Sequence, residues 1–349
     1  MNKSNIANLS LSQLTEFLVS LGLPKYRGAQ VFSWLYRPGV TDFCQMTDLS
    51  KELRLTLSAQ TCFHWPQLVE TEHSQDGTMK FGFKLEDSNY IEAVLIPEDG
   101  RNTLCISSQV GCAMACGFCL TGSIGFKRNL MPAEIVGQVV RVRQWLLDAK
   151  DVKEKLNNLV FMGMGEPLAN FDNLLTSLAI MTEQRGLNFS DRRITVSTCG
   201  LVPRIIELGQ KTKVNLAVSL HSVDDAIRSK LMPINKKYPV AELLEACRNF
   251  PMPRRKRIMF EYILIKNLND SAAAAQQLAE KLKTIPCKIN LLPYNESPSL
   301  PFRRPAKEQI ELFQNILWQA GYTVLLRASR GADISAACGQ LAGKMISNL

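Results

Sequence analysis

The chain has 349 residues, of which 46% are hydrophobic and 21% charged, and its formal net charge is +9. This length and composition are typical of a globular protein with a large buried core, and they exclude a disordered or fibrous chain. No stretch reaches about 18 uncharged apolar residues, so the sequence predicts no membrane-spanning helix.

Apolar residues recur at helical spacing near the start of the chain. They predict three helices, at residues 11–21, 26–36 and 49–59. The first lacks the basic segment and apolar run of an export signal, so we expect a cytoplasmic protein without a disulfide framework. Alternating residues then predict short strands at 78–85 and 89–96. We expect residues 1–100 to form a small N-terminal α+β accessory domain.

From residue 101 onward, β-rich apolar runs alternate with helical segments. The expected strands are residues 103–107, 158–162, 194–198, 215–220, 257–265, 288–292 and 322–326. The expected helices are residues 132–147, 170–183, 240–248, 272–282 and 308–319. This alternation is typical of a parallel sheet, and about six repeats predict an α/β fold, a partial (βα)6 barrel over residues 101–349. Ligands of such sheets bind at the carboxyl ends of the strands.

A cysteine triplet, Cys112, Cys116 and Cys119, follows the first strand of this barrel. Three thiolates from one loop can bind three irons of a 4Fe–4S cluster and leave the fourth iron open to a small molecule. Zinc would want a fourth ligand, and no histidine lies beside the triplet, while isolated cysteines are most often small buried hydrophobes. The spacing, with Phe118 before the last cysteine, resembles the signature of the radical S-adenosylmethionine (SAM) superfamily. That resemblance implies one 4Fe–4S cluster, with SAM chelated at the open iron.

A glycine-rich segment, Gly163-Met164-Gly165-Glu166-Pro167, follows the strand expected at 158–162. Glycines let the backbone approach a ligand closely, and an acidic side chain accepts hydrogen bonds from an ammonium group, although taken alone the segment could be a flexible turn. After a three-cysteine loop it resembles the superfamily motif that holds the SAM amino group, which implies Gly165 and Glu166 as SAM contacts. Later strand ends offer the further SAM contacts Ser197, Ser219, Leu220, His221 and Asn295. Taken alone, Ser197 could cap a helix and Asn295 could belong to an ordinary turn.

Two more cysteines stand outside the triplet, Cys105 on the strand before it and Cys338 in a glycine-flanked segment past the last strand. Taken alone, each could be a small buried hydrophobe. Together with the segments around them, they resemble the RlmN/Cfr family of RNA adenosine methyltransferases. The motifs that carry this resemblance are residues 104–112, 163–167, 232–236 and 337–341, and it runs from about residue 10 to 343.

The resemblance implies an enzyme that methylates C2 of one adenosine in 23S rRNA (adenosine 2503) and of adenosine 37 in tRNAs, consuming two SAM molecules per turnover. Cys338 would carry the methyl group as S-methylcysteine, Cys105 would resolve the intermediate through a transient disulfide with Cys338, and Glu92 would accept the C2 proton. Pro167 after Gly165-Glu166 resembles the C2 type rather than the C8 type. The family also implies a flavodoxin-type electron donor and a monomer. The cysteines that match no family position are expected to pack: Cys44, Cys62, Cys199, Cys247 and Cys287.

The charge is uneven along the chain. Residues 1–100 hold 8 Lys and Arg against 12 Asp and Glu, whereas residues 101–349 hold 33 against 20. A basic catalytic part suits a polyanion such as RNA, although it could also be a solvated surface. We also expect Lys25 and Arg27 of the acidic N-terminal domain to contact RNA. The basic runs are Lys127-Arg128, Arg192-Arg193, residues 253–257 and Arg303-Arg304.

Three alternatives remain at this point. One is a methyltransferase of the C8 type. Another is a radical SAM enzyme that acts on a peptide or metabolite, which would have no need of Cys105, Cys338 or a basic core. The third is an iron–sulfur protein that binds RNA without catalysis, which would not need the motif at residues 163–167.

Overall fold

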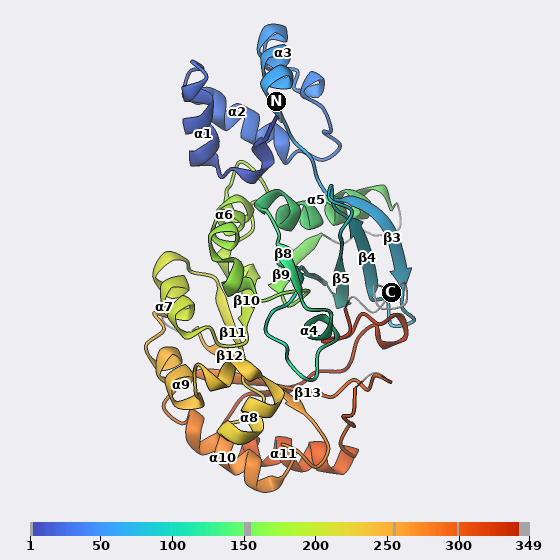
Figure 1. Cartoon of the computed structure of the whole chain (residues 1–349), viewed down its shortest axis with the longest axis vertical. Helices are drawn as coiled ribbons and strands as arrows, with labels where there is room; N and C mark the ends of the chain where they lie inside the picture. Colours follow the sequence, from blue (N-terminus) through green and yellow to red (C-terminus); the bar gives the residue numbers. More distant parts are fainter. Residues whose placement is uncertain (1–2, 99, 150–154, 254–255, 299, 342–349) are drawn as a thin grey trace.

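The computed structural model describes residues 3–98, 100–149, 155–253, 256–298 and 300–341 (Figure 1). The α-helices are α1 (Leu11–Ser20), α2 (Tyr26–Leu35), α3 (Lys51–Gln60), α4 (Leu120–Ile124), α5 (Pro132–Asp148), α6 (Phe171–Thr182), α7 (Val202–Lys211), α8 (Asp225–Leu231), α9 (Val240–Arg248), α10 (Ala272–Leu282) and α11 (Lys307–Gln319). The strands are β1 (Ser4–Asn5), β2 (Thr61–Cys62), β3 (Gln67–His73), β4 (Met79–Lys84), β5 (Tyr90–Glu98), β6 (Arg101–Cys105), β7 (Gln109–Gly111), β8 (Phe126–Asn129), β9 (Leu156–Phe161), β10 (Ile194–Thr198), β11 (Asn215–Ser219), β12 (Ile258–Leu264), β13 (Cys287–Pro293) and β14 (Val324–Leu326). Within these described ranges, no helix is long and apolar enough to cross a membrane.

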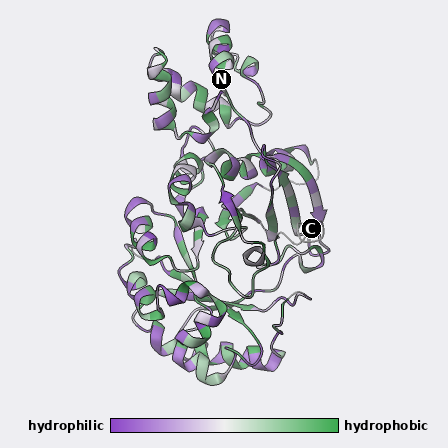
Figure 2. Ribbon diagram, in the orientation of Figure 1, coloured by the Kyte–Doolittle hydropathy of each residue, from purple (hydrophilic) through white to green (hydrophobic). Residues whose placement is uncertain are grey.

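Ten of the strands form one sheet, in the order β14-β13-β12-β11-β10-β9-β6-β5-β4-β3. Neighbours from β14 to β6 pair in parallel, and helices lie along the outside of this part of the sheet (Figure 1). Hydrophobic positions recur along the strands and on the adjoining helices (Figure 2). The predicted α/β partial barrel is confirmed, because each parallel connection needs a crossover helix that covers the sheet.

The other end of the sheet differs from the prediction. The sequence pattern groups the strands at 78–85 and 89–96 with the N-terminal helices, whereas the structure pairs them with the barrel. β5 lies antiparallel to β6, from Val94 opposite Cys105 to Glu98 opposite Arg101, and β4 and β3 follow at the sheet edge. The accessory strands are therefore continuous with the strand that leads to the cysteine loop.

The helices α1, α2 and α3 stand apart from the barrel, at the top of Figure 1. Helix α1 begins with a capping box, because the Ser10 amide donates to Gln13 Oε1 at 2.9 Å and the Gln13 amide donates to Ser10 Oγ at 3.4 Å. Leu14 and Leu18 on its inner face are fully buried, which contributes roughly 1.5–3 kcal/mol each. The Ala133 amide at the start of α5 donates to Asn8 Oδ1 at 2.9 Å, linking this helical group to the barrel.

The prediction missed β3, the short strands β1, β2, β7 and β8, and three helices, α4, α7 and α8. Helix α7 carries Pro203 in its first turn and Gly209 in its interior, and both lower the helical signal of a sequence window. Helices α4 and α8 are too short to show a helical period.

Candidate active site

The cysteine triplet lies on the loop between β7 and α4. The backbone at the start of this loop packs closely against Gly125. Gly111 has a φ of +72°, and a Cβ atom there would lie 1.8 Å from the Gly125 carbonyl oxygen, so the position requires glycine. The Cys112 amide donates to that carbonyl at 3.0 Å, and the Cys119 amide donates to the Cys116 carbonyl at 3.1 Å. The three thiols therefore come close enough for every pair of them to interact electrostatically.

The loop docks on the barrel through a small second hydrophobic cluster. Phe118 packs against this cluster, and its ring meets the His221 ring edge-on with 4.8 Å between the centroids. The Gly117 amide donates to the Leu231 carbonyl at 2.9 Å. His221 directly follows β11, so the triplet lies over the carboxyl ends of the strands, as predicted. The buried members of the cluster are Cys199, Leu231, Met232, Ile263, Ile265 and Tyr294.

The donor chemistry of the loop fits an iron–sulfur cluster. Burial raises the pKa of Cys112 to about 12 and also raises the pKa of Cys116, so both are neutral thiols until a cation displaces their protons. Among the residues that the structure describes, no three His, Cys, Asp or Glu side chains converge as ligands of a single ion. A 4Fe–4S cluster needs no such convergence, because each thiolate binds a different iron. The loop therefore suits a cluster better than zinc.

The predicted SAM motif follows β9 and faces the loop. Gly165 has a φ of +99°, and a Cβ atom there would lie 2.5 Å from Gln109 Cβ. Glu166 is 3% exposed, and its carboxylate accepts hydrogen bonds from the Leu168 amide at 2.9 Å and the Cys199 amide at 2.7 Å. Burial raises the pKa of this carboxyl. Since a carboxylate can accept about four hydrogen bonds, Glu166 retains capacity for the ammonium group of a ligand.

The remaining predicted SAM contacts lie at neighbouring strand ends: Ser197 on β10, Ser219, Leu220 and His221 at the end of β11, and Asn295 after β13. Ser197 and Ser219 are half-buried, and the Leu220 and His221 amides both donate to the Glu261 carbonyl. His221 Nδ1 accepts from the Ile263 amide at 3.1 Å, and burial lowers the pKa of this imidazole to about 3. His221 is therefore neutral, and its Nε2 is left as the donor.

A buried arginine that the sequence analysis overlooked arranges these strand ends. Arg228 on α8 is fully buried and donates to the carbonyls of Cys199, Leu220 and Ser219 at 2.8, 3.1 and 3.2 Å. It also donates to Asn235 Oδ1 at 2.9 Å, within the recognised motif at residues 232–236. One guanidinium thus joins β10, β11 and that motif. The sequence carries no signal for this role, because arginine on a helix is usually exposed.

Cys338 reaches the cysteine loop because the C-terminal segment is hydrogen-bonded to α4. The Leu120 amide, next to Cys119, donates to the Gly339 carbonyl at 2.8 Å. Thr121 Oγ1 donates to the Leu341 carbonyl at 3.2 Å. Two hydrogen bonds therefore hold the segment against the loop, and each joins residues more than 200 positions apart in the sequence.

The structure brings Cys105 and Cys338 together. Cys105 is buried at the end of β6, and burial raises the pKa of its thiol. It lies near enough to Cys338 for a charge on that sulfur to raise the pKa of Cys105 further, as a charge on Cys119 raises that of Cys338. The Cys338 side chain keeps contact with solvent, but partial loss of hydration around its sulfur and the Glu261 charge raise its pKa to about 11. Because Val94 pairs with Cys105 and side chains alternate along a strand, Glu92 lies on the same face of the sheet as Cys105.

Lys80 on β4, also overlooked, connects Glu92 with the C-terminal segment. Its ammonium group lies 3.1 Å from Glu72 Oε1 and 3.6 Å from Glu92 Oε1. It also donates to the Ile334 carbonyl at 2.7 Å, four residues before Cys338. Lys80 is 4% exposed and Glu92 is fully buried. The lysine therefore balances the buried Glu92 and the half-buried Glu72 while it anchors the segment that carries Cys338.

The turn between β3 and β4 provides a second anchor. Ser74 Oγ donates to Asp333 Oδ1 at 2.6 Å, and the Gly331 amide donates to Asp76 Oδ2 at 3.0 Å. Burial would raise the pKa of Asp76, but hydrogen bonds from Thr78 and Gly331 bring it down to about 2. The strands that the prediction assigned to the accessory module thus hold the C-terminal segment.

A third overlooked residue, Glu261 on β12, faces the same region. Its Oε1 accepts from Asn290 Nδ2 at 2.9 Å, and burial raises its pKa to about 7. The carboxylate charge in turn raises the pKa of Cys338. A buried acid in the middle of an apolar strand carries no motif, so only the fold could reveal it.

Some predictions for the other cysteines and basic residues need correction. All ten cysteines are free thiols, and Cys199, Cys247 and Cys287 are buried as expected, but Cys44 is exposed and Cys62 is half-buried. Both lie in the small N-terminal region, which has less core to cover them. Arg128 pairs with Asp87 and Glu134, so it serves the fold instead of standing free for phosphate. Arg254 and Arg255 lie outside the described residues.

Known proteins resemble this chain over nearly its whole length. Residues 4–63 match the ribosomal RNA large subunit methyltransferase N-terminal domain, and residues 106–278 match the radical SAM superfamily. Proteins named dual-specificity RNA methyltransferase RlmN from Desulfotalea psychrophila and Geobacter sulfurreducens are 56% and 52% identical, over 97% and 98% of this chain and 95% and 92% of their own lengths. The crystal structure of a radical SAM methyltransferase from Sphaerobacter thermophilus superposes with a TM-score of 0.90 and 43% sequence identity. The match covers 97% of this chain and 99% of that chain. The chain therefore belongs to the RlmN family of dual-specificity RNA methyltransferases within the radical SAM superfamily.

Proposed function

We propose that this radical SAM RNA methyltransferase adds a methyl group to C2 of adenosine 2503 in 23S rRNA and of adenosine 37 in tRNAs, through S-methylcysteine at Cys338. The observation that carries the proposal is the meeting of Cys105 and Cys338 beside Cys119. A radical SAM enzyme without a cysteine methyl carrier would have no use for this pair. Pro167 after Gly165-Glu166 supports the C2 type over the C8 type.

In this proposal Cys112, Cys116 and Cys119 hold the 4Fe–4S cluster, and the strand-end residues from Gly165 to Asn295 hold SAM. When bound, these groups supply the methyl group and the one-electron chemistry that activates it, with two SAM molecules consumed per turnover. The Cys338 sulfur would carry the methyl carbon, which would lose one hydrogen atom to the SAM-derived radical before it bonds to C2 of adenine. Glu92 would take the C2 proton, and the surplus electron would return to the cluster. The Cys105 sulfur would then bond to the Cys338 sulfur as the carbon–sulfur bond breaks, and the released carbon would gain a proton and become the methyl group of the product.

We extend the proposal to the surroundings of the enzyme. A flavodoxin-type protein supplies electrons, and the enzyme works as a monomer in the cytoplasm. Residues 1–100 form the accessory part, whose strands extend the barrel sheet and carry Glu92, and contact RNA through Lys25 and Arg27. Residues 101–349 form the main catalytic part. Support for the RNA contact comes from the surface, since Lys25 is exposed and the Arg27 guanidinium lies over the exposed Tyr26 ring at 4.8 Å.

The test is anaerobic reconstitution with iron, sulfide, SAM, a reductant and an rRNA fragment or tRNA, followed by mass spectrometry of the nucleosides. We expect 2-methyladenosine from both RNAs. If 8-methyladenosine formed instead, the enzyme would be of the C8 type, and the absence of both products would contradict the proposal.

The role of Cys105 predicts a trapped intermediate. Cys105→Ala should accumulate a covalent protein–RNA adduct, visible as a shifted band on a denaturing gel, because no thiol is left to break the carbon–sulfur bond. Cys247→Ala, which removes a buried cysteine of α9, is the matched control and should form free product. Free product at the normal rate from Cys105→Ala would refute the assignment.

A further inference from the structure

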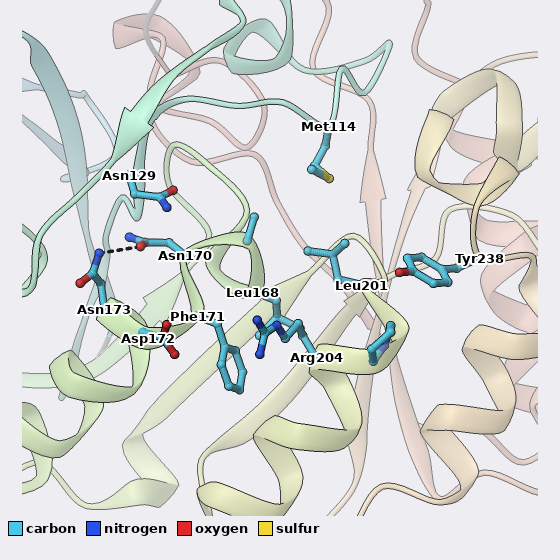
Figure 3. Close-up of a pocket in the computed structure, with 12 residues that line it drawn as sticks. Met114, Asn129, Leu168, Asn170, Phe171, Asp172, Asn173, Leu201, Arg204 and Tyr238 are labelled. Carbon is cyan, nitrogen blue, oxygen red and sulfur yellow. Dashed lines mark hydrogen bonds between the residues drawn. The ribbon is translucent and has the colours of Figure 1, made fainter.

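A cavity of about 520 Å³ lies beside the cysteine loop, and none of the residues assigned above to the cluster or SAM lines it (Figure 3). Met114, between two of the triplet cysteines, forms one wall, and the first turns of α6 and α7 form another. Leu168 and Leu201 make part of the surface apolar. The volume lies within the range of about 300–1,000 Å³ that is usual for small-ligand sites.

Two asparagines line this cavity. Asn129 Oδ1 accepts from Gln109 Nε2 at 2.8 Å, which leaves Asn129 Nδ2 as a donor. Asn173 Nδ2 donates to Asn170 Oδ1 at 2.8 Å on the same wall (Figure 3). Within the described part of the chain, Asn129 Nδ2 has no hydrogen-bond partner. An amide donor on the wall of a cavity matches the acceptor atoms on the edge of a nucleobase.

The walls also provide surfaces on which a base can stack. The half-buried Tyr238 ring borders the cavity, and the exposed Arg204 guanidinium lies 4.6 Å from the centre of the Phe171 ring. Lys237, 5.4 Å from the centre of the Tyr238 ring, and Lys211, 5.7 Å from that of Phe171, add cations at the rim. Aromatic rings and guanidinium planes stack on unpaired bases, and nearby cations attract the phosphates of the same strand.

One side chain separates this cavity from the SAM motif. Gln109 holds Asn129 through its Nε2, and its Oε1 accepts from the Glu166 amide at 2.8 Å. A base in the cavity would therefore lie one side chain away from the SAM motif.

We propose that the cavity binds an unpaired nucleobase of the RNA substrate next to the adenosine that is methylated. This inference rests on RNA as the substrate. The adenine of SAM has the same nucleobase chemistry, so the experiment must separate the two sources. Enzymes that modify a base in a loop pay for unstacking it, and a second pocket for the neighbouring base lowers that cost.

The test combines protein variants with RNA variants. tRNA anticodon-arm hairpins, each with one loop base removed to leave an abasic ribose, are bound to the reconstituted enzyme with S-adenosylhomocysteine, and the affinity is measured by fluorescence anisotropy. The protein variants are Asn173→Ala and Tyr238→Leu. Asn249→Ala, at an exposed asparagine that follows α9, is the control. SAM affinity is measured in parallel, and cluster absorption and melting temperature check the fold.

For one base next to the target, we expect removal to weaken binding about tenfold in the wild type and in Asn249→Ala. Asn173→Ala and Tyr238→Leu should bind the intact hairpin about tenfold more weakly and should lose nothing more when that base is removed. If the loss of affinity from each protein variant and the loss from removing a base multiplied at every loop position, the inference would be overturned. The same would follow if a variant bound SAM more weakly and RNA as tightly as the wild type. Failure of the wild type to methylate the intact hairpin would contradict the proposed function instead.

Discussion

The cysteine loop and the Cys105–Cys338 pair lie side by side, yet the chain builds them in opposite ways. The loop takes its three thiols from residues 112–119 and closes on itself through the Cys112 amide and the Gly125 carbonyl. The thiol pair joins β6 to a segment more than 200 residues later, and bonds from β4, the β3–β4 turn and α4 hold that segment in place. The first is a local structure, whereas the second depends on the whole fold.

This difference determines what each region tolerates. The spacing of the three thiols within the loop is set mainly by residues in or next to it, so we expect the cluster ligands to be most sensitive to changes there. An assembled pair fails when any distant anchor is lost, even though neither cysteine has changed. Substitutions in the two regions should therefore differ in how far from the thiols they act.

The largest effect should come from inside the loop. Cys112→Ala removes one of three thiolates, so we expect loss of bound iron, of cluster absorption and of all methylation after reconstitution. Cys247→Ala, at a buried cysteine outside the triplet, should keep all three. A full complement of iron in Cys112→Ala would show that the loop is not the ligand set.

A large effect should also come from a distant anchor of the thiol pair. Lys80→Met removes the cation beside Glu72 and Glu92, so we expect the free energy of unfolding to fall by about 3 kcal/mol. Limited proteolysis should then cut the C-terminal segment faster, while iron binding stays normal. Lys80→Arg should recover part of the stability, and Lys84→Met, an exposed lysine on the same strand, should change it by less than about 0.5 kcal/mol. Unchanged stability and proteolysis in Lys80→Met would break the distinction between the two regions.

A smaller effect should appear at the N-terminal helices, far from both thiol groups. Reversing the charge with Lys25→Glu and Arg27→Glu should weaken tRNA and rRNA binding by about tenfold and flatten its salt dependence, since two phosphate contacts are lost. The control is Lys307→Glu, at an exposed lysine of α11. Unchanged binding of both RNAs would remove these helices from the RNA interface.

The smallest effect should be a change in the acidity of Cys338. Loss of hydration and the Glu261 carboxylate together raise its pKa to about 11, so the neutral Glu261→Gln should lower that pKa. Above pH 7, where Glu261 is largely ionised in the wild type, Cys338 of the variant should therefore react faster with iodoacetamide. The rate is followed by peptide mass spectrometry, with Cys44 as the internal reference. An unchanged ratio across pH 7–10 would show that Glu261 does not act on Cys338.

Much of the fold was predictable from the sequence, because its signals are local. Alternating strand and helix patterns identified the barrel. The helices that were missed either lack a clear helical period, such as α8, or contain Pro and Gly, such as α7. Of the strands at the accessory edge, β4 and β5 were recognised as strands, but their pairing with the barrel was not. Pairing between β5 and β6 depends on hydrogen bonds between segments, and alternation within one segment carries no information about them.

By itself, the sequence predicted the cluster ligands and the SAM motif, since each is defined by the spacing of a few neighbouring residues. The family resemblance added Cys105, Cys338 and Glu92 as members of one site. Only the tertiary structure decided how they meet, through Lys80, Arg228 and the two ends of the C-terminal segment. It also revealed Glu261 and the cavity beside Met114. These residues act through burial and contacts between distant segments, and such contacts exist only once the chain has folded.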